Sequence, residues 1–298
     1  MASPQVVLIS GTSTGFGRLF AETLARHGHI VFATMRDPAV RNAANANELR
    51  ALAGRESVEI NVMEMDVTDE VSVDRAVHDC MGRAGRIDVV INNAGYAVAG
   101  LTEATTLNQA REIMETNFFG AVRVNRAVLP FMRKQRSGLL MHVSSGAGRL
   151  VVPGCALYCA TKFALEAVAE AYRYELAGQG IDSVIVQPGA YKTAVFGNMV
   201  TAADHARSNT YGAAAQIPDK VTTALSATTA DAQEVADAVL SIVETPAGQR
   251  QLRYRVSPAD LGVDAINSVC AEAQERLLDA FGLTADTTFK QQSAASAD

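Results

Sequence analysis

A short apolar run that leads directly into a glycine-rich turn constrains the fold of this 298-residue chain more than any other feature. Residues 6–9 are continuously apolar and rich in β-branched side chains, as in a strand buried on both faces. A helical pattern follows the turn and ends at Gly28. In this order, the glycines let the backbone approach a phosphate, and the free N–H groups of the helix N-terminus attract it. A turn without any ligand is the alternative. The turn residues expected to bind a pyrophosphate are Gly11, Thr12, Ser13, Thr14, Gly15, Phe16 and Gly17.

The alternation of strand and helix patterns continues along most of the chain. It predicts an α/β fold, a Rossmann-type doubly wound parallel sheet of seven strands in three layers. The further strands are expected at residues 30–34, 58–65, 87–91, 139–143, 181–187 and 250–256. Residues 190–230 interrupt this alternation of strands and helices, and long insertions of this kind are usually lids or binding loops. We therefore expect a single domain over residues 1–298, with a helical substrate lid at about 190–230 and a C-terminal extension at about 257–298.

Composition excludes several other classes of protein. The net charge of −6 offers no basic stripe, so no nucleic acid partner is expected. The sequence has no evident signal peptide and no run of about 18 apolar residues that would span a membrane. The four cysteines and five histidines match no disulfide or metal-ligand spacing, so we expect no metal and a reduced, cytoplasmic location. Cys155 and Cys159 are expected to pack as small apolar side chains, and the arginines of residues 250–255 to lie on a solvated strand edge.

The end of the second strand bears on cofactor choice, because it normally reaches the adenosine ribose of a dinucleotide. Arg36 can pair with the 2′-phosphate of NADP and stack over adenine, whereas Asp37 could hold the 2′-hydroxyl of NAD. Pro38 indicates that Asp37 already begins a turn. We therefore expect NADP, with NAD bound through Asp37 as the less favoured alternative.

Two further strand ends carry candidate cofactor contacts. Asp66 follows the third strand and could accept from the adenine amino group or cap the next helix, although Thr68 or Asp69 is the better cap. Small and amide residues follow the fourth strand, where the chain can pass directly beneath a cofactor. The expected cofactor-binding residues here are Asp66, Val67, Asn93, Ala94 and Gly95.

Tyr158 and Lys162 stand four residues apart at the start of a strongly helical pattern, so their side chains share one helix face. A neighbouring ammonium favours the phenolate and lowers the pKa of the tyrosine, which suits it to proton transfer. Taken alone, this spacing more often belongs to an ordinary amphipathic helix. Asn117, in a long helical pattern at residues 107–132, is unfavourable by propensity and indicates a specific hydrogen-bonding role.

The motifs come in one fixed order that resembles the short-chain dehydrogenase/reductase family, of the compact single-domain type. They are the turn around Thr12, Asn92-Asn93-Ala94-Gly95, Asn117, Ser145, Tyr158-x-x-x-Lys162 and Pro188-Gly189. The resemblance covers roughly residues 5–260, and residues 32–38 and 172–176 further resemble the branch of 17β-hydroxysteroid and retinol dehydrogenases. Two departures are Ser10, where the family more often has threonine, and the bulky Tyr191 near the expected place of the nicotinamide carboxamide.

The resemblance implies that a nicotinamide cofactor exchanges a hydride with a carbonyl carbon. Tyr158 would be the general acid or base, and Lys162 would favour the phenolate and bond the nicotinamide ribose. Ser145 would position the substrate oxygen, with Ser144 as the competing serine, and Asn117 would hold a water linked to Lys162. Pro188, Gly189 and Thr193 would complete the cofactor site.

We therefore expect an NADP(H)-dependent oxidoreductase that interconverts a ketone and a secondary alcohol. The lid residues Phe196, Met199 and Tyr211 favour a hydrophobic substrate. A non-catalytic NADP-sensing regulator and an NAD-dependent dehydrogenase are the alternatives, and a sugar-nucleotide epimerase would need a larger C-terminal domain. The long helices at residues 107–132 and 158–177 resemble the family's subunit interface, so we expect a homodimer or homotetramer that does not associate with a membrane.

Overall fold

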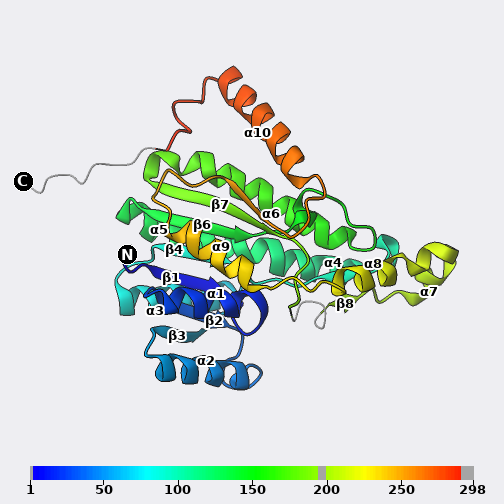
Figure 1. The fold of residues 1–298 in the computed structure, drawn as a ribbon, viewed down its shortest axis with the longest axis horizontal. Coiled ribbons are helices and arrows are strands. Elements are labelled where there is room, and N and C mark those ends of the chain that lie inside the picture. The colour runs from blue at the N-terminus through cyan, green and yellow to red at the C-terminus, as the bar shows by residue number, and fades with distance from the viewer. Residues whose placement is uncertain (1–2, 194–198, 290–298) are drawn as a thin grey trace, which may run out of the picture.

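The computed structural model describes residues 3–193 and 199–289 and has a seven-stranded parallel sheet at its centre (Figure 1). The strand order is β3-β2-β1-β4-β6-β7-β9, which confirms the predicted doubly wound topology. The strands are β1 Val6–Ser10, β2 Ile30–Met35, β3 Ile60–Glu64, β4 Val89–Asn92, β6 Gly138–Val143, β7 Ile181–Pro188 and β9 Arg253–Val256.

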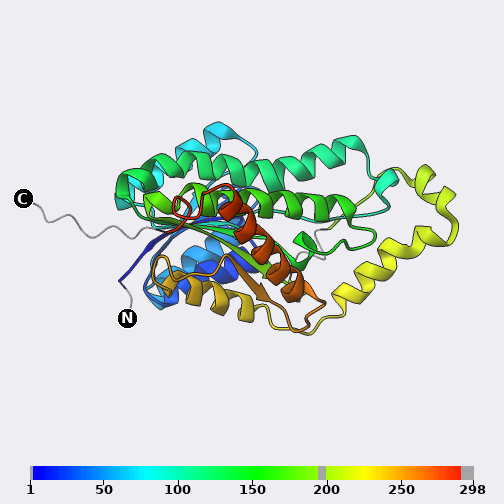
Figure 2. The same cartoon turned by 90° about the horizontal axis from the view of Figure 1, so that it is seen from above.

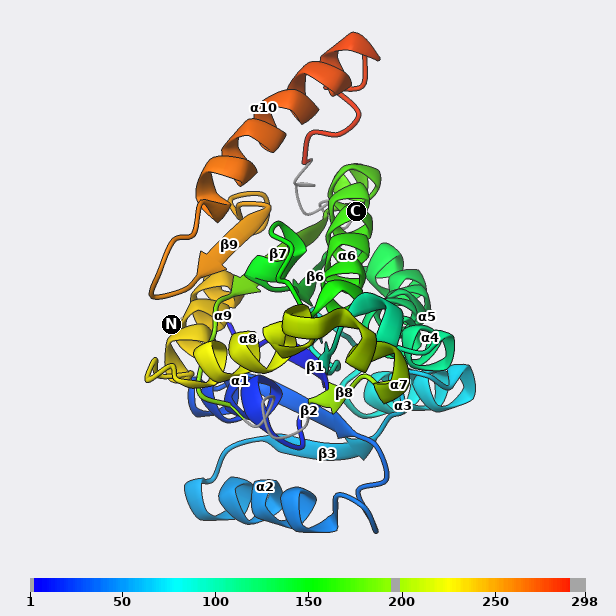
Figure 3. The ribbon, with the colours of Figure 1, turned by 90° about the vertical axis from the view of Figure 1, so that its right-hand side faces the viewer.

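Helices cover both faces of the sheet and give the three predicted layers (Figure 3). One face carries α1 Gly15–Arg26, α2 Ala43–Glu56 and α9 Gln233–Glu244. The other face carries α3 Glu70–Ala84, α5 Gly120–Gln135 and α6 Ala156–Glu175. Val7 and Ile9 of β1 pack into the first layer, and Val6 and Leu8 into the second. A strand between two helical layers must be apolar at every position, which is why residues 6–9 show no alternation.

The predicted helix at residues 107–132 is interrupted by one turn of π-helix at Glu115–Phe119. It separates α4 Leu107–Met114 from α5. Asn117 lies inside this turn, where its Oδ1 accepts from Tyr96 N at 3.0 Å and its Nδ2 donates to Tyr96 O at 2.9 Å. Both bonds go to the loop after β4, so the asparagine does have the specific hydrogen-bonding role that its poor helix propensity indicated.

The insertion after β7 lies beyond the carboxyl ends of the strands, at one end of the molecule (Figure 2). Its elements are β8 Val200–Thr201, α7 His205–Ser208, a 3₁₀ segment at Asn209–Gln216 and α8 Ile217–Ser226. β8 pairs in parallel with β5 Val98–Ala99, a contact that the sequence pattern does not predict. Phe196, expected in the lid, lies outside the described residues.

The C-terminal helix α10 Val263–Ala280 leaves the body of the protein next to β9 and projects away from it (Figures 1 and 3). Its first residue, Val263, is buried, whereas Val269 and Phe281 are 64% and 68% exposed. The helix is therefore anchored at its N-terminal end. Within residues 3–193 and 199–289, no helix combines the length and apolarity required to cross a membrane.

The prediction of a solvated arginine edge at residues 250–255 is wrong for two of its members. Arg250 is 7% exposed and its Nη1 lies 2.7 Å from Asp182 Oδ2. Arg253 Nε lies 3.1 Å from Glu166 Oε2. The two side chains are only 6% and 7% exposed, because carboxylates from β7 and α6 neutralise them. These partners lie some 70 to 90 positions away along the chain, so local sequence does not reveal them.

Candidate active site

A cavity of about 1340 Å³ opens along the carboxyl ends of the strands. Its walls come from the glycine-rich turn, the ends of the central strands, the insertion after β7 and the loop between β9 and α10. In a doubly wound sheet, this edge is where ligands bind, because the strand order reverses here and the loops diverge.

The turn between β1 and α1 leaves the N-terminus of α1 free to bind an anion. Thr14, the N-cap residue, makes no side-chain bond to the first turn of the helix, which also lacks acidic residues. Gly11, with φ of +72°, approaches Ala94 so closely that a Cβ would lie 2.8 Å from its Cα. The exposed N–H groups and the helix dipole together favour a phosphate.

Two residues predicted to bind the cofactor do not line the cavity and instead build the turn. A Cβ at Gly17 would lie 2.3 Å from Gly11 O and 2.4 Å from Asn93 Nδ2, so only glycine fits there. Thr12 is fully buried, and its hydroxyl donates to Thr34 O at 3.0 Å. The other five predicted turn residues do line the cavity, namely Gly11, Ser13, Thr14, Gly15 and Phe16.

Hydrogen bonds from two side chains link the glycine-rich turn to the end of β4. Asn93 Nδ2 donates to Ser10 O and Gly11 O, both at 2.9 Å. Ser10 Oγ accepts from Asn93 N and Ala94 N, both at 3.0 Å. Ser10 thus supplies a hydroxyl at the position where the family more often has threonine. Asn93, Ala94 and Gly95 all line the cavity, as predicted.

Arg36 and Asp37 differ in where their side chains lie. Arg36 is exposed and lines the cavity. Asp37, with φ of +44°, caps its own turn: its carboxylate oxygens accept from Val40 N at 3.1 Å and Arg41 N at 3.2 Å. This is the turn that Pro38 indicated. Three polar residues that the sequence did not single out also line this end, namely Arg41, Asn42 and Asn45.

Asp66 and Val67 line the cavity at the end of β3. Asp66 Oδ1 accepts from the backbone N and the hydroxyl of Thr68, at 2.9 and 2.8 Å. The cap of α3 is Asp69, whose side chain accepts from Val71 N at 3.0 Å. Asp66 is therefore not the helix cap, which leaves its second carboxylate oxygen for a ligand.

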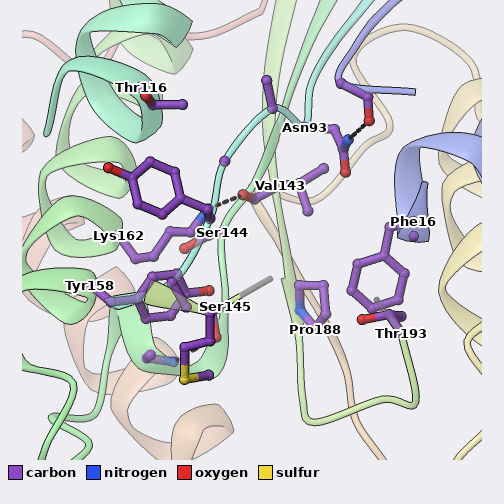
Figure 4. A pocket seen from close by; sticks show the side chains of 18 of the residues that line it. Phe16, Asn93, Thr116, Val143, Ser144, Ser145, Tyr158, Lys162, Pro188 and Thr193 are labelled. Carbon is purple, nitrogen blue, oxygen red and sulfur yellow. Dashed lines mark hydrogen bonds between the residues drawn. The ribbon is translucent and has the colours of Figure 1, made fainter. Parts of the chain in front are cut away.

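Ser145, Tyr158 and Lys162 converge at the other end of the cavity (Figure 4). Lys162 Nζ donates to Val143 O at 2.8 Å, which uses one of its three N–H donors. Ser145 Oγ accepts from Ala147 N at 3.1 Å and is hydrogen-bonded to Tyr158. Ser144 instead donates to Glu166 Oε1 at 2.8 Å. Both serines line the cavity, but of the two Ser145 is the one that interacts with Tyr158.

Burial dominates the ionisation of this pair. It raises the pKa of the Tyr158 phenol to about 12, against a smaller lowering by the hydrogen bond with Ser145. It lowers the pKa of the Lys162 ammonium to about 8, against a smaller raising by Glu166. The expectation that Lys162 lowers the pKa of Tyr158 is therefore not met in this structure, because desolvation disfavours both charged forms.

Asn117 does not line the cavity, although its neighbour Thr116 does. Besides its bonds to Tyr96, Asn117 Nδ2 donates to Thr161 Oγ1 at 3.2 Å. It therefore links the loop after β4 to α6 beside Lys162. Its expected role in holding a water stays a prediction.

Tyr191 lines the cavity, but its side chain packs into the hydrophobic core. Its side chain is 2% exposed, it meets Phe16 edge-on with ring centroids 5.9 Å apart, and its hydroxyl donates to Glu234 Oε2 at 3.0 Å. Pro188, Gly189 and Thr193 line the cavity, and Figure 4 shows Pro188 and Thr193 across from Ser145 and Tyr158. Tyr191 thus packs against the first turn of α1, which contains Phe16.

Apolar side chains from three separate segments form the wall next to Tyr158. Cys155 lines this wall and is buried, as is Cys159, and burial raises the pKa of the Cys155 thiol to about 11. Both pack as small apolar residues, as predicted, and the raised pKa disfavours a reactive thiolate. The loop before α10 was not expected to contribute. The other apolar wall residues include Leu150, Val152, Met199, Leu225, Pro258, Leu261 and Val263.

The sheet, the glycine-rich turn and the group formed by Ser145, Tyr158 and Lys162 place the chain in the class of Rossmann-type oxidoreductases. A model of the short chain dehydrogenase family matches residues 5–204, so the chain belongs to this family. The prediction made from the order of the motifs is thereby confirmed.

Relatives and solved structures agree with this assignment. The chain is 40% identical over 190 residues to the 3-ketodihydrosphingosine reductase of Bacteroides thetaiotaomicron, covering 64% of this chain and 65% of that protein. It is 35% identical over 201 residues to Retinol dehydrogenase 8 of Bos taurus, covering 66% and 62%. The chain thus spans a little under two thirds of the length of these relatives. A short-chain dehydrogenase from Streptomyces avermitilis matches with a TM-score of 0.75 and 30% identity, covering 97% of this chain and 100% of that one.

Proposed function

We propose that the chain is an NADP(H)-dependent oxidoreductase that interconverts a hydrophobic ketone and its secondary alcohol, with Tyr158 as general acid and base. The observation that carries the proposal is the layout of the cavity. An uncapped helix N-terminus and Arg36 line it at one end, and Ser145, Tyr158 and Lys162 at the other.

The residues present fit a nicotinamide dinucleotide phosphate. The N-terminus of α1 would hold the pyrophosphate, because its first N–H groups have no side-chain cap. Arg36 and Arg41 would hold the 2′-phosphate, since both line the cavity and Asp37 is engaged in its own turn. When bound, the cofactor supplies or accepts the hydride.

The chain's own groups account for the proton. Tyr158, neutral because of burial, can donate its phenolic proton to a carbonyl oxygen as that oxygen gains negative charge. Ser145 can donate a second hydrogen bond to the same oxygen and fix its position. Lys162 has donors left for a ribose hydroxyl, and its positive charge stabilises the phenolate after the proton has left.

The apolar wall beside Tyr158 supports a hydrophobic substrate. The relatives with this family fold include proteins named for a sphingoid-base ketone and for retinol, both hydrophobic compounds. We extend to this chain the class of hydrophobic ketones and alcohols, which would bury chain or ring surface against Leu150, Leu225 and Val263.

A panel of aliphatic, aromatic and long-chain ketones tests the proposal, with oxidation of NADPH and NADH followed in parallel by absorbance. Turnover with NADPH is expected for hydrophobic members of the panel. Tyr158→Phe should lower kcat by about two orders of magnitude or more, because general acid catalysis contributes that much, while NADPH still binds.

Tyr172→Phe is the matched control, because Tyr172 lies on the same helix α6 and does not line the cavity. It should leave turnover unchanged. A Tyr158→Phe variant that keeps full turnover would show that Tyr158 is not the acid. Tight NADPH binding without turnover of any ketone or alcohol would favour the sensor alternative.

A further inference from the structure

A buried carboxylate lies one helical turn beyond Lys162 on α6 and takes no part in the proposed reaction. Glu166 is 1% exposed, yet its oxygens have four partners. Oε1 accepts from Ser144 Oγ and from Gln187 Nε2, both at 2.8 Å. Oε2 lies 3.1 Å from Arg253 Nε and 3.0 Å from Arg149 Nε. Moving a carboxylate out of water costs desolvation free energy. A charged carboxylate in the interior therefore needs several ionic or hydrogen-bonding partners, as Glu166 has.

The partners of Glu166 belong to segments that carry the site. Ser144 directly precedes Ser145, and Gln187 directly precedes the Pro-Gly pair that lines the cavity. Gly148, at the end of the 3₁₀ turn after Ser145, leaves no room for a side chain. A Cβ there would lie 2.5 Å from Glu166 Oε1 and 2.6 Å from Ser144 Oγ. The turn that follows Ser145 thus packs directly against the carboxylate of Glu166.

The same cluster reaches the C-terminal helix. Asn267 Nδ2 of α10 donates to Gln187 Oε1 at 2.8 Å. Arg149 Nη1 lies 4.0 Å from Cys270 Sγ, also on α10. The helix that follows the cavity wall at residues 258–263 is therefore joined through Gln187 to Glu166.

We propose that Glu166 is a positioning residue for proton transfer, which fixes the Ser144–Gly148 turn against α6 so that Ser145 and Tyr158 face the same substrate oxygen. The inference rests on the proposed ketone reduction. The charged groups around Glu166 are Arg149 from the loop, Arg253 from β9, and Lys162 and Glu170 from α6. The negative charge of Glu166 also raises the pKa of Lys162, against burial, and so helps Lys162 to keep its proton.

Glu166→Gln tests this inference, with Glu170→Gln as the matched control. Glu170 lies one turn further on α6 and accepts from Arg253 Nη2 at 2.5 Å and from the Tyr174 hydroxyl at 2.9 Å. Both variants therefore remove a carboxylate from Arg253, but only Glu166→Gln disturbs Ser144. We expect Glu166→Gln to lower kcat roughly tenfold to a hundredfold, as a small misplacement of a catalytic group does, with the KM for NADPH almost unchanged.

The control should keep kcat even though it also loses some thermal stability. The kcat/KM profile of Glu166→Gln should fall at a lower pH than that of the wild type, because Lys162 loses a neighbouring negative charge. Equal kcat values for the two variants would reduce Glu166 to a structural ion pair and overturn the inference.

A crystal structure of Glu166→Gln gives a readout that does not depend on turnover. We expect Ser145 Oγ to leave the reach of the Tyr158 hydroxyl in the variant. An unmoved Ser145–Tyr158 pair overturns the inference whatever the activity of the wild type. A wild-type chain that reduces no ketone would refute the proposed function. The crystal structure of Glu166→Gln would still show whether Glu166 holds Ser145 in place.

Discussion

Lys162 Nζ lies 5.7 Å from the ring centroid of Tyr158, over its face, while it donates to Val143 O at 2.8 Å. The ammonium therefore faces the aromatic ring and a backbone carbonyl. Both contacts favour the charged lysine, but burial opposes them and lowers its pKa to about 8. The pKa of Tyr158, raised to about 12, lies far above it. Of the two groups, Lys162 is thus the one that titrates near neutrality.

The first prediction is a fall in kcat/KM for ketone reduction as the pH rises through about 8. kcat/KM reports the ionisation of the free enzyme, and Lys162 loses its proton in that range while Tyr158 remains a neutral acid. Lys162→Arg keeps a charge that does not titrate, so its residual activity should lack this fall. A wild-type profile that stays level to pH 10 would contradict the lowered pKa.

The second prediction separates NADPH from NADH. Arg36→Ala should weaken NADPH binding by about tenfold to a hundredfold, because a charge-assisted bond to phosphate is worth roughly 1.5–3 kcal/mol, and should leave NADH binding nearly unchanged. Arg50→Ala is the control, since Arg50 lies on α2, away from the cavity, and contacts Asn47. Fluorescence titration of both cofactors checks the result. Equal weakening of NADPH and NADH binding would instead favour NAD as the cofactor, bound through Asp37.

The sequence predicted best those features that depend on local pattern. The apolar run of residues 6–9 and the glycines of the turn follow from burial on two faces and from close backbone approach, so β1 and the phosphate turn could be placed in advance. Features that depend on partners far along the chain could not be predicted from the sequence. Arg253 looked exposed because Glu166, its partner, stands 87 positions earlier. The apolar wall from the loop before α10 was missed because only the folded chain brings Val263 to the cavity.

The third prediction concerns acid stability and follows from His142, which is fully buried. Its Nδ1 lies 3.3 Å from Val184 O, so Nδ1 carries the proton, and Nε2 accepts from Asn125 Nδ2 at 3.0 Å. Burial lowers its folded-state pKa to about 4, whereas an unfolded histidine titrates near 6.5. Between these values only the unfolded chain takes up the proton. The contribution to stability is therefore complete above pH 6.5 and is lost as the pH falls toward 4, by about 3 kcal/mol.

Denaturant unfolding at pH 7 and pH 4.5 measures this loss. His142→Gln has no titrating ring and should show a smaller drop in unfolding free energy between the two pH values than the wild type. His78→Gln is the control, because His78 is exposed on α3 and its replacement should not change the drop. Identical drops in the wild type and in His142→Gln would show that other groups, and not His142, cause the acid sensitivity.

The fourth prediction concerns the buried ion cluster at the start of β7. Asp182 is fully buried and accepts from Arg173 Nη1 at 2.6 Å, Arg250 Nη1 at 2.7 Å and Gly248 N at 3.0 Å. Asp182→Asn keeps the shape but leaves two guanidinium groups without their counter-charge. Breaking a buried pair in this way costs about 3–5 kcal/mol, so the variant should unfold at a much lower urea concentration.

Glu56→Gln is the control for this cluster, because it removes a carboxylate from Arg26 at a surface where both side chains remain partly exposed, at 29% and 42%. Solvent screens that pair, so the control should lose only a small fraction of the stability lost by Asp182→Asn. The chain has no tryptophan, and far-ultraviolet circular dichroism therefore serves as the probe of unfolding. Asp182 lies at the opposite end of β7 from Pro188, so the folded Asp182→Asn protein should keep the NADPH affinity of the wild type. Equal losses in the two variants would mean that the Asp182 cluster is no stronger than a surface pair.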